Sequence, residues 1–204
     1  MRRICLVALA LTAYCGYGQG KLQFDQQVNP TTAPGGFFNI APDPTGQSFI
    51  PTLSSVGFVQ FYFDDASFNG IGSTISVNLW SGSIGIGTLL GTSETISTPD
   101  VFNGAATFLF TAPVTVTPGT TYYLQPFIQS EDPSQLGVVG NNYPNGAGYL
   151  HGVQQAGDFW FREGIVVPEP SIFSLSLLGA AGLCAVWRNR RNFVLRSGPS
   201  FLRK

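Results

Sequence analysis

Cysteine is missing from the central part of this 204-residue chain. The three cysteines, Cys5, Cys15 and Cys184, lie near the two ends of the sequence. The stretch between Gln19 and Val167 can therefore form no disulfide and no thiolate metal site, and it has no cysteine nucleophile. Its stability has to come from a packed core.

Basic residues are nearly as scarce in that stretch. Between Gln19 and Val167 the sequence has two basic residues, Lys21 and Arg162, against ten acidic ones, which gives a formal net charge of −8. The whole chain carries only −1, because the other eight basic residues lie in the terminal segments. A domain this acidic repels a phosphate backbone, so we expect no nucleic-acid partner.

Histidine is limited to one residue, His151, in a region rich in Gly, Asn, Tyr and Pro. A Ser-His-Asp hydrolase needs a serine nucleophile in a recognisable turn, and no G-x-S-x-G motif is present. The glycines of residues 85–91 fit neither G-x-G-x-x-G nor the P-loop, so a glycine-rich hairpin is favoured there. These features predict a protein without enzymatic activity.

Paired carboxylates are the remaining candidates for chemistry. Asp64-Asp65 and Glu131-Asp132 lie in predicted turns, where Asp commonly starts a turn through its own backbone, so turn formation is favoured over glycosidase chemistry. Loop carboxylates also suit a structural Ca²⁺, although no EF-hand loop is present. The ligands to test for calcium are Asp64, Asp65, Asp132 and Asp158; no other cofactor is expected.

The composition of residues 21–166 points to strands. Phe, Val, Ile, Thr and Tyr are frequent, and Gly and Pro interrupt the sequence every eight to fifteen residues. The predicted strands are residues 47–50, 56–63, 73–81, a short strand within 82–91, 92–97, 105–110, 114–116, 120–128 and 158–166. Short strands with such turns and no helices predict an all-β antiparallel β-sandwich.

Four places along the chain give further detail. Residues 56–63 are apolar at both parities, which is typical of a central strand covered on both faces. Residues 73–81 alternate, so one face of that strand is expected to be buried. Pro126 predicts an edge strand or a bulge, and residues 131–157 are expected to form a long functional or mobile loop.

Several short motifs resemble those of a jelly-roll ectodomain common in exported bacterial proteins. They are Gln47-Ser48-Phe49, Ile75-Ser76-Val77, residues 87–91, residues 117–122 and residues 157–162. The resemblance implies a fold similar to galactose-binding-like carbohydrate modules. It carries over no ligand residue.

Aromatic side chains provide the argument for sugar binding. Trp80 and Trp160 fall on the polar parity of their predicted strands, and Tyr143 and Tyr149 lie in the long loop. An exposed ring can stack on the face of a sugar, whereas a tryptophan can also be partly buried under a loop. The four aromatics are candidate carbohydrate contacts.

The N-terminus has the pattern of a secretory signal peptide. Met1-Arg2-Arg3 is a positive n-region, residues 4–13 are an apolar h-region, and residues 14–20 are small and polar. We expect residues 1–20 to be removed and residues 21–166 to be the exported domain. A lipoprotein signal at Cys15 is not favoured, because Tyr14 stands where a small residue is needed.

The C-terminus joins three features in a fixed order. Val167-Pro168-Glu169-Pro170 is followed by an uncharged apolar run to Trp187, predicted as a transmembrane helix over residues 171–187, and then by Arg188, Arg190 and Arg191. Such a helix is roughly 25 Å long, and flanking arginines can snorkel to extend it. The arginines keep the end that they follow in the cytoplasm, so the domain lies outside. Residues 192–204 form a basic cytoplasmic tail.

This order resembles the PEP-CTERM sorting signal of exported bacterial proteins, here residues 167–191. The resemblance implies processing by an exosortase, with a membrane-anchored precursor and a final place at the cell surface or in the extracellular matrix. The alternative is a plain tail anchor with a chance Pro-Glu-Pro linker. Two roles remain open for the exported domain: a structural or adhesive protein of an exopolysaccharide envelope, or a carbohydrate-binding module without catalytic activity.

Overall fold

The computed structural model describes residues 20–28, 31–40, 44–129 and 134–168. The predictions for the signal peptide before Gly20, the helix 171–187 and the tail 192–204 lie outside these residues. In the described part of the chain no helix combines the length and the apolar character that crossing a membrane requires. Residues Leu22–Val167 make up one compact unit, which contains every described strand residue except Lys21.

All regular secondary structure in the described residues is β-strand. The strands are β1 (Lys21–Gln27), β2 (Gly36–Asn39), β3 (Gly46–Phe49), β4 (Ser55–Asp64), β5 (Thr74–Ser81), β6 (Thr88–Thr92), β7 (Ile96–Ser97), β8 (Asn103–Thr115), β9 (Tyr122–Ile128), β10 (Gln135–Val138), β11 (Gly148–Leu150), β12 (Val153–Gln154) and β13 (Phe161–Val167).

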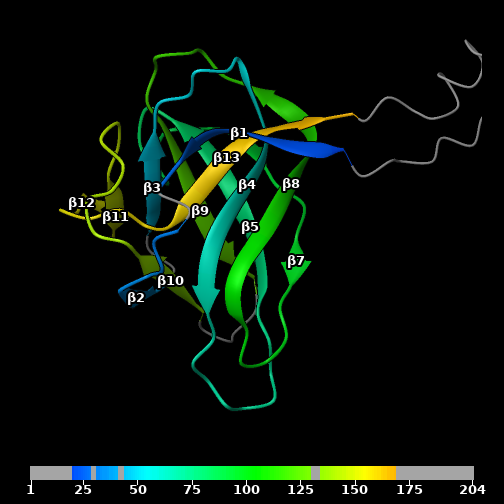
Figure 1. The fold of residues 1–204 in the computed structure, drawn as a ribbon, viewed down its shortest axis with the longest axis vertical. Coiled ribbons are helices and arrows are strands. Elements are labelled where there is room, and N and C mark those ends of the chain that lie inside the picture. The colour runs from blue at the N-terminus through cyan, green and yellow to red at the C-terminus, as the bar shows by residue number, and fades with distance from the viewer. Residues whose placement is uncertain (1–19, 29–30, 41–43, 130–133, 169–204) are drawn as a thin grey trace, which may run out of the picture. The chain divides into compact units, whose positions relative to one another are not determined.

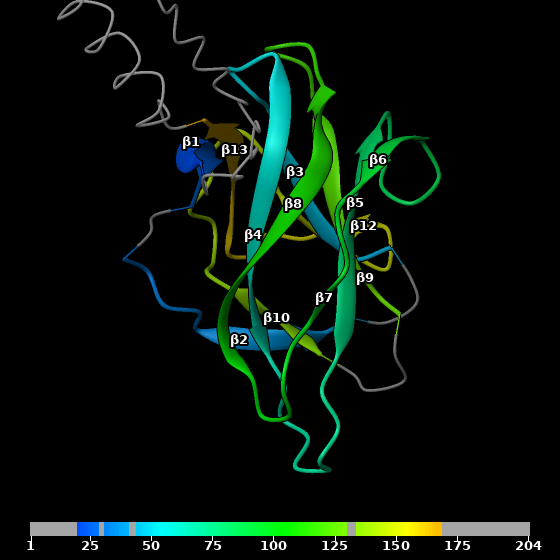
Figure 2. The same ribbon diagram turned by 90° about the vertical axis from the view of Figure 1, so that its right-hand side faces the viewer.

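The strands form two antiparallel sheets (Figure 1). The first has the order β1-β13-β4-β10-β2, with β8 on the other side of β4; the second has the order β12-β11-β3-β9-β5-β6, with β7 beside β5. Figure 2 shows the two sheets nearly edge-on, stacked as the two layers of a sandwich. The predicted all-β sandwich is confirmed.

The hydrophobic core lies between the two sheets, and β4 of the first sheet contributes side chains to it. Phe61 and Phe63 of β4 point inward and are buried, as are Ile75, Val77 and Leu79 of β5, which the alternation of residues 73–81 predicted. Successive side chains of a strand face opposite sides, so Phe58 lies on the outer face of its sheet. It is fully buried there beneath Phe24 of β1, with ring centroids 5.4 Å apart. Residues 56–63 therefore form a strand covered on both faces, as predicted.

Several strands in the described residues were not predicted from the sequence. β1 and β2 lie in the first forty residues. β10, β11 and β12 lie in the segment predicted as one long loop, where β10 pairs with β2 and β4, and β11 pairs with β3 and β12. The long-loop prediction was wrong for these residues because Gly- and Asn-rich segments can still extend a sheet when distant strands offer them backbone partners.

Two predicted interruptions also differ. Residues 105–110 and 114–116 were predicted as separate strands, but residues up to Thr115 belong to one strand, β8, whose register with β4 shifts between Val56 and Phe58. Pro126 lies in β9, an inner strand between β3 and β5. Since β3 pairs with β9 through Tyr122, Tyr123 and Leu124, the strand has one neighbour at Pro126, and no ladder hydrogen bond is lost there.

Candidate functional site

Three partly exposed aromatic side chains form a row across the outer face of the seven-stranded sheet. Trp80 of β5 lies directly opposite Tyr123 of β9 in the strand pairing. Tyr123 in turn meets Tyr149 of β11, with ring centroids 5.4 Å apart and an edge-to-face angle of 80°. All three rings are half-buried, so part of each remains open to solvent. We call these residues the aromatic row.

The strand alternation produces this row. Because Leu79 and Leu124 point into the core, their neighbours Trp80 and Tyr123 must point outward. The indole Nε1 of Trp80 donates a hydrogen bond to Oε1 of Gln125 at 2.8 Å, which fixes the orientation of the ring. The row is thus held in place before any ligand arrives.

The two strands that carry Trp80 and Tyr123 have no charged side chain on their outer face. The outward side chains of β5 and β9 are uncharged: Ser76, Asn78, Trp80, Tyr123, Gln125 and Phe127. Burial raises the pKa of the Tyr149 hydroxyl, and the neighbouring Tyr123 raises it further. The face is therefore neutral at physiological pH and combines aromatic rings with amide and hydroxyl groups.

Two of the four predicted carbohydrate contacts cannot act as stacking surfaces. Trp160 is 5% exposed, with its ring 5.9 Å from that of Tyr62 and the guanidinium of Arg162 4.6 Å from its centroid. Tyr143 is 4% exposed and packs edge-to-face on Phe161 at 5.1 Å. The alternation of residues correctly placed Trp160 on the face opposite Phe161, but Tyr62 and Arg162 cover its ring there. Of the four candidates, Trp80 and Tyr149 keep partly exposed rings, and Tyr123 lies between them.

A buried polar network occupies the place where Tyr143 was expected to be free. The Tyr143 hydroxyl donates to Oε1 of Gln26 at 3.0 Å and accepts from the backbone N–H of Ile50 at 3.2 Å. Oε1 of Glu163, which is fully buried, accepts from the N–H of Gln26 at 3.1 Å. Burial raises the pKa of Tyr143 to about 12, against the hydrogen bond from Ile50, with nearby Glu163 adding to the rise. These groups tie β1 to the interior.

The predicted calcium ligands have separate partners. Asp158 is saturated: Oδ1 accepts from Nε2 of Gln47 at 2.9 Å, and Oδ2 accepts from the N–H groups of Asn142 and Tyr143, both at 2.8 Å. Asp64 accepts from Nδ2 of Asn103. Asp132 lies outside the described residues. Nowhere in the described part of the chain do three His, Cys, Asp or Glu side chains group so as to hold a metal ion, so Asp64, Asp65 and Asp158 form no shared site.

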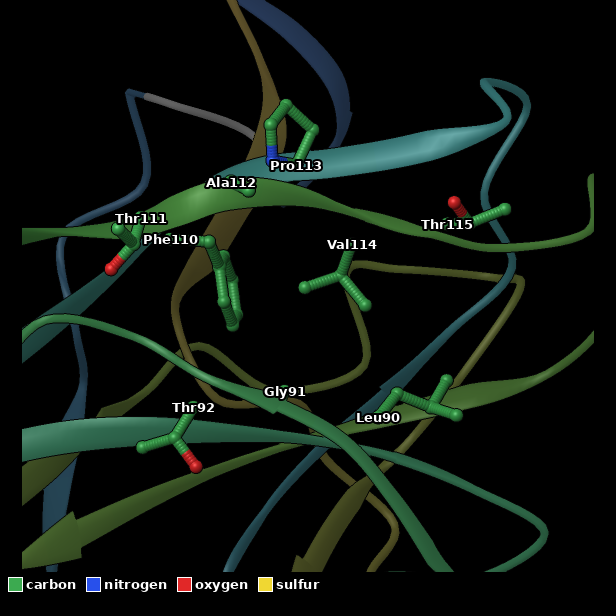
Figure 3. Close-up of a pocket in the computed structure, with 9 residues that line it drawn as sticks. All are labelled: Leu90, Gly91, Thr92, Phe110, Thr111, Ala112, Pro113, Val114 and Thr115. Carbon is green, nitrogen blue, oxygen red and sulfur yellow. The ribbon is translucent and has the colours of Figure 1, made fainter.

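A groove opens where the edges of the two sheets meet. It has a volume of about 470 Å³ and lies between β6 and β8 (Figure 3). Phe110 and Val114 of β8 point into the space that separates the two strands. Its lining holds no charged residue: Leu90, Gly91, Thr92, Phe110, Thr111, Ala112, Pro113, Val114 and Thr115. Sequence reasoning missed this groove, because the register shift that opens it cannot be read from composition.

His151 occupies the turn between β11 and β12 and is exposed. Its backbone φ is 52°, in the left-handed region. It is an exposed turn residue.

The comparisons with known proteins concern the end of the domain. Residues 166–191 match the PEP-CTERM protein-sorting motif, beginning within β13. No curated protein matches the sequence. The match confirms the resemblance seen in Val167, Pro168, Glu169 and Pro170, and it includes Arg188, Arg190 and Arg191, whose structure lies outside the described residues. The described part of the chain is an all-β sandwich, and the chain carries a PEP-CTERM motif, which implies exosortase-dependent sorting to the cell surface.

Proposed function

We propose that this is a non-catalytic adhesive protein of the cell surface, which binds neutral exopolysaccharide through the aromatic row. The observation that carries the proposal is the alignment of Trp80, Tyr123 and Tyr149 across neighbouring strands. Aromatic rings with one open face match the apolar C–H face of a pyranose, while Asn78 and other polar groups beside them can bond its hydroxyls.

The rigidity of the row favours binding. Its residues belong to strands of one sheet, and the Trp80 indole is already fixed by Gln125. A preorganised surface loses little conformational entropy when a ligand is bound. A flat row also suits an extended polymer better than a small molecule, which prefers a concave site.

The negative charge of the domain favours neutral polysaccharides over polyanionic ones. With two basic and ten acidic residues between Gln19 and Val167, the domain repels a polyanion, whereas a neutral glycan meets no such repulsion. We therefore expect binding to neutral polysaccharides and none to alginate at low salt.

Two carboxyl groups of the domain have structural roles, which supports a protein without catalytic activity. Asp158 and Glu163 are buried and hold backbone amides of the loop and of β1. Groups committed to the interior in this way do not reach a substrate.

The test is co-sedimentation of the full-length protein in detergent, at low salt and without calcium, with insoluble glucan, insoluble galactan and bead-coupled alginate. Trp80→Ala and Tyr123→Ala should each reduce the bound fraction at least tenfold. Phe68→Ala is the matched control, because Phe68 is an 85% exposed aromatic residue in the loop between β4 and β5 and does not belong to the row; it should bind as the wild type does. Absence of binding to every polymer would contradict the adhesive proposal and leave a structural role in the envelope.

A further inference from the structure

The sequence contains three Asn-Gly pairs: Asn69-Gly70, Asn103-Gly104 and Asn145-Gly146. In such a pair the backbone nitrogen of the glycine can attack the side-chain amide carbon of the asparagine, because glycine has no Cβ to hinder the approach. The ring closure is helped by a base that takes the glycine N–H proton and by a donor to the amide oxygen. The surroundings of each pair therefore decide whether it reacts.

Asn69-Gly70 lies exposed in the loop of residues 65–73, between β4 and β5, at the lower end of the domain in Figures 1 and 2. Gly70 has a φ of 79°, in the left-handed region, and a Cβ built there would meet nothing within 4 Å. The N–H of Ile71 donates to Oδ1 of Asn69 at 2.8 Å. This bond polarises the amide and stabilises the negative charge that develops on Oδ1 during attack.

Asp100 brings a carboxylate to the same point from the loop of residues 98–102. Its Oδ2 accepts from the N–H of Gly70 at 3.1 Å, so a base already contacts the proton that has to leave. Its other oxygen, Oδ1, is buried without a hydrogen-bond partner, so no donor competes for the charge of the carboxylate at that oxygen.

Backbone hydrogen bonds fix the two loops against each other on both sides of this contact. The N–H of Asp65 donates to the carbonyl of Phe102 at 2.8 Å, and the N–H of Thr98 donates to the carbonyl of Ser73 at 2.9 Å. Base, nucleophile and polarised amide are thus held together before the reaction, which lowers its entropic cost.

Asn103-Gly104 lacks this arrangement. The pair belongs to β8 and lies opposite Asp64 and Phe63 of β4. Oδ1 of Asn103 accepts from the Tyr62 hydroxyl at 2.6 Å, and Nδ2 donates to Asp64. Because the strand pairing keeps the backbone of Gly104 extended, its nitrogen cannot turn toward the amide carbon without breaking the sheet.

Asn145-Gly146 lacks the donor to the amide oxygen. The N–H that corresponds to that of Ile71 belongs to Ala147, and it donates to Oγ of Ser48 at 2.9 Å. Of the three pairs, Asn69-Gly70 therefore combines both kinds of assistance.

We propose that Asn69-Gly70 is a site of self-catalysed deamidation, with Asp100 as the base. Asp100 takes the proton from the Gly70 nitrogen, and this nitrogen forms a bond to Cγ of Asn69. The Cγ–Nδ2 bond breaks, and the amide nitrogen leaves with that proton as ammonia. Water then opens the cyclic imide at either carbonyl and leaves aspartate or isoaspartate at position 69.

The modification separates the two loops at this point. In the cyclic imide the nitrogen of Gly70 carries no hydrogen, so its hydrogen bond to Asp100 is lost. After hydrolysis a new carboxylate stands beside that of Asp100, and the like charges repel. The surface around Phe68, which is 85% exposed in the same loop, changes with it.

The test is incubation of the full-length protein in detergent at neutral pH, folded and in urea, followed by mass spectrometry of its peptides. In urea the three pairs should react at similar rates, because they share the same dipeptide. In the folded protein Asn69 should react at least about tenfold faster than Asn103 or Asn145.

Two variants separate the base from a general effect of charge. Asp100→Asn should slow the reaction at Asn69 at least about tenfold. Its rate should also rise more steeply with pH than that of the wild type, because hydroxide then replaces the carboxylate as the base. Asp64→Asn is the matched control: its carboxylate accepts from Asn103, and its loss should change the rate at Asn69 by less than about twofold.

Two outcomes would overturn the proposal. One is an Asn69 that reacts in urea but stays unmodified in the folded protein, which would mean that its hydrogen bonds protect the amide. The other is a reaction that is as fast in Asp100→Asn as in the wild type, or faster. The first comparison uses the wild type alone, so it decides the matter even if Asp100→Asn does not fold.

Discussion

The carboxyl group of Glu163 on β13 lies beside that of Asp25 on β1, and at neutral pH only Asp25 is ionised. Burial raises the pKa of Glu163 to about 9, with the negative charge of nearby Asp25 adding to the rise. Burial would raise the pKa of Asp25 too, but hydrogen bonds from Thr52 and from the Leu53 amide outweigh it and lower the pKa. Because Glu163 is neutral, the two carboxyl groups can lie close together without repulsion, and Glu163 holds β1 through the N–H of Gln26.

This pair predicts that the protein loses stability as the pH rises from about 4.5 to about 9. The pKa of Glu163 is raised in the folded state, so its contribution is complete below its unfolded pKa of 4.5 and is lost as the pH rises through about 9. Within that window the free energy of unfolding should fall by about 1.4 kcal/mol per pH unit from this group. The pKa of Asp25 is lowered in the folded state, so its contribution to stability is complete above its unfolded pKa of 3.8 and is lost as the pH falls below that value. Urea denaturation from about pH 3 to pH 9 measures both.

Glu163→Gln is the control for this prediction. An amide keeps the shape and the acceptor for the Gln26 N–H but does not ionise. The variant should be as stable as the wild type near pH 5 and should lack the fall toward pH 9. An equal alkaline fall in both proteins would show that another group is responsible.

Asp158 predicts a second measurable effect, through the loop that it holds. Its carboxylate accepts three hydrogen bonds, one from Gln47 and two from backbone N–H groups of the loop. Asp158→Asn replaces one acceptor by an NH₂ group facing donors, so we expect a loss of about 2–3 kcal/mol in the free energy of unfolding. Asp64→Asn, in a more exposed pair, should cost less than about 0.5 kcal/mol. Similar losses for both would contradict this role of Asp158.

Two glycines in strands give a matched pair for packing. A Cβ on Gly46 of β3 would lie 1.9 Å from the carbonyl oxygen of Leu124, so Gly46→Ala forces β3 and β9 apart and should cost at least about 3 kcal/mol. A Cβ on Gly36 of β2 meets nothing within 4 Å. Gly36→Ala should therefore be neutral or stabilising by up to about 1 kcal/mol. Thermal unfolding of both variants makes the comparison.

The sequence predicted the parts of the fold that local patterns determine. The apolar run around Phe61 and the alternation through Val77 identified strands of the core, because burial of one or both faces leaves a clear period. β1 and β10 gave no such signal. β1 has three Gln, one Lys and one Asp among its seven residues, and it is held by Glu163, a residue more than one hundred positions away.

Only part of the candidate site could be predicted, because local patterns identify single residues but not their neighbours on other strands. Parity placed Trp80 on an outer face, and Tyr149 was chosen for its aromatic ring. Tyr123 was missed because its role depends on the register of β9 against β5, which sets it opposite Trp80. Trp160 looked equivalent to Trp80 by parity, yet Tyr62 and Arg162 cover it. The position of Tyr123 and the burial of Trp160 both depend on contacts between strands, which the sequence of one strand does not show.

The fluorescence of Trp80 tests the central claim most directly. The chain has three tryptophans, Trp80, Trp160 and Trp187, so the full-length variant Trp160→Phe, Trp187→Phe leaves Trp80 as the single reporter. On titration with a soluble neutral glucan or galactan, the emission should shift to shorter wavelength and saturate, because a stacked sugar removes water from the half-buried indole. The shift should vanish in Tyr123→Ala, and alginate should leave the spectrum unchanged. An emission spectrum that no neutral polysaccharide alters would contradict the claim that the aromatic row binds the polymer.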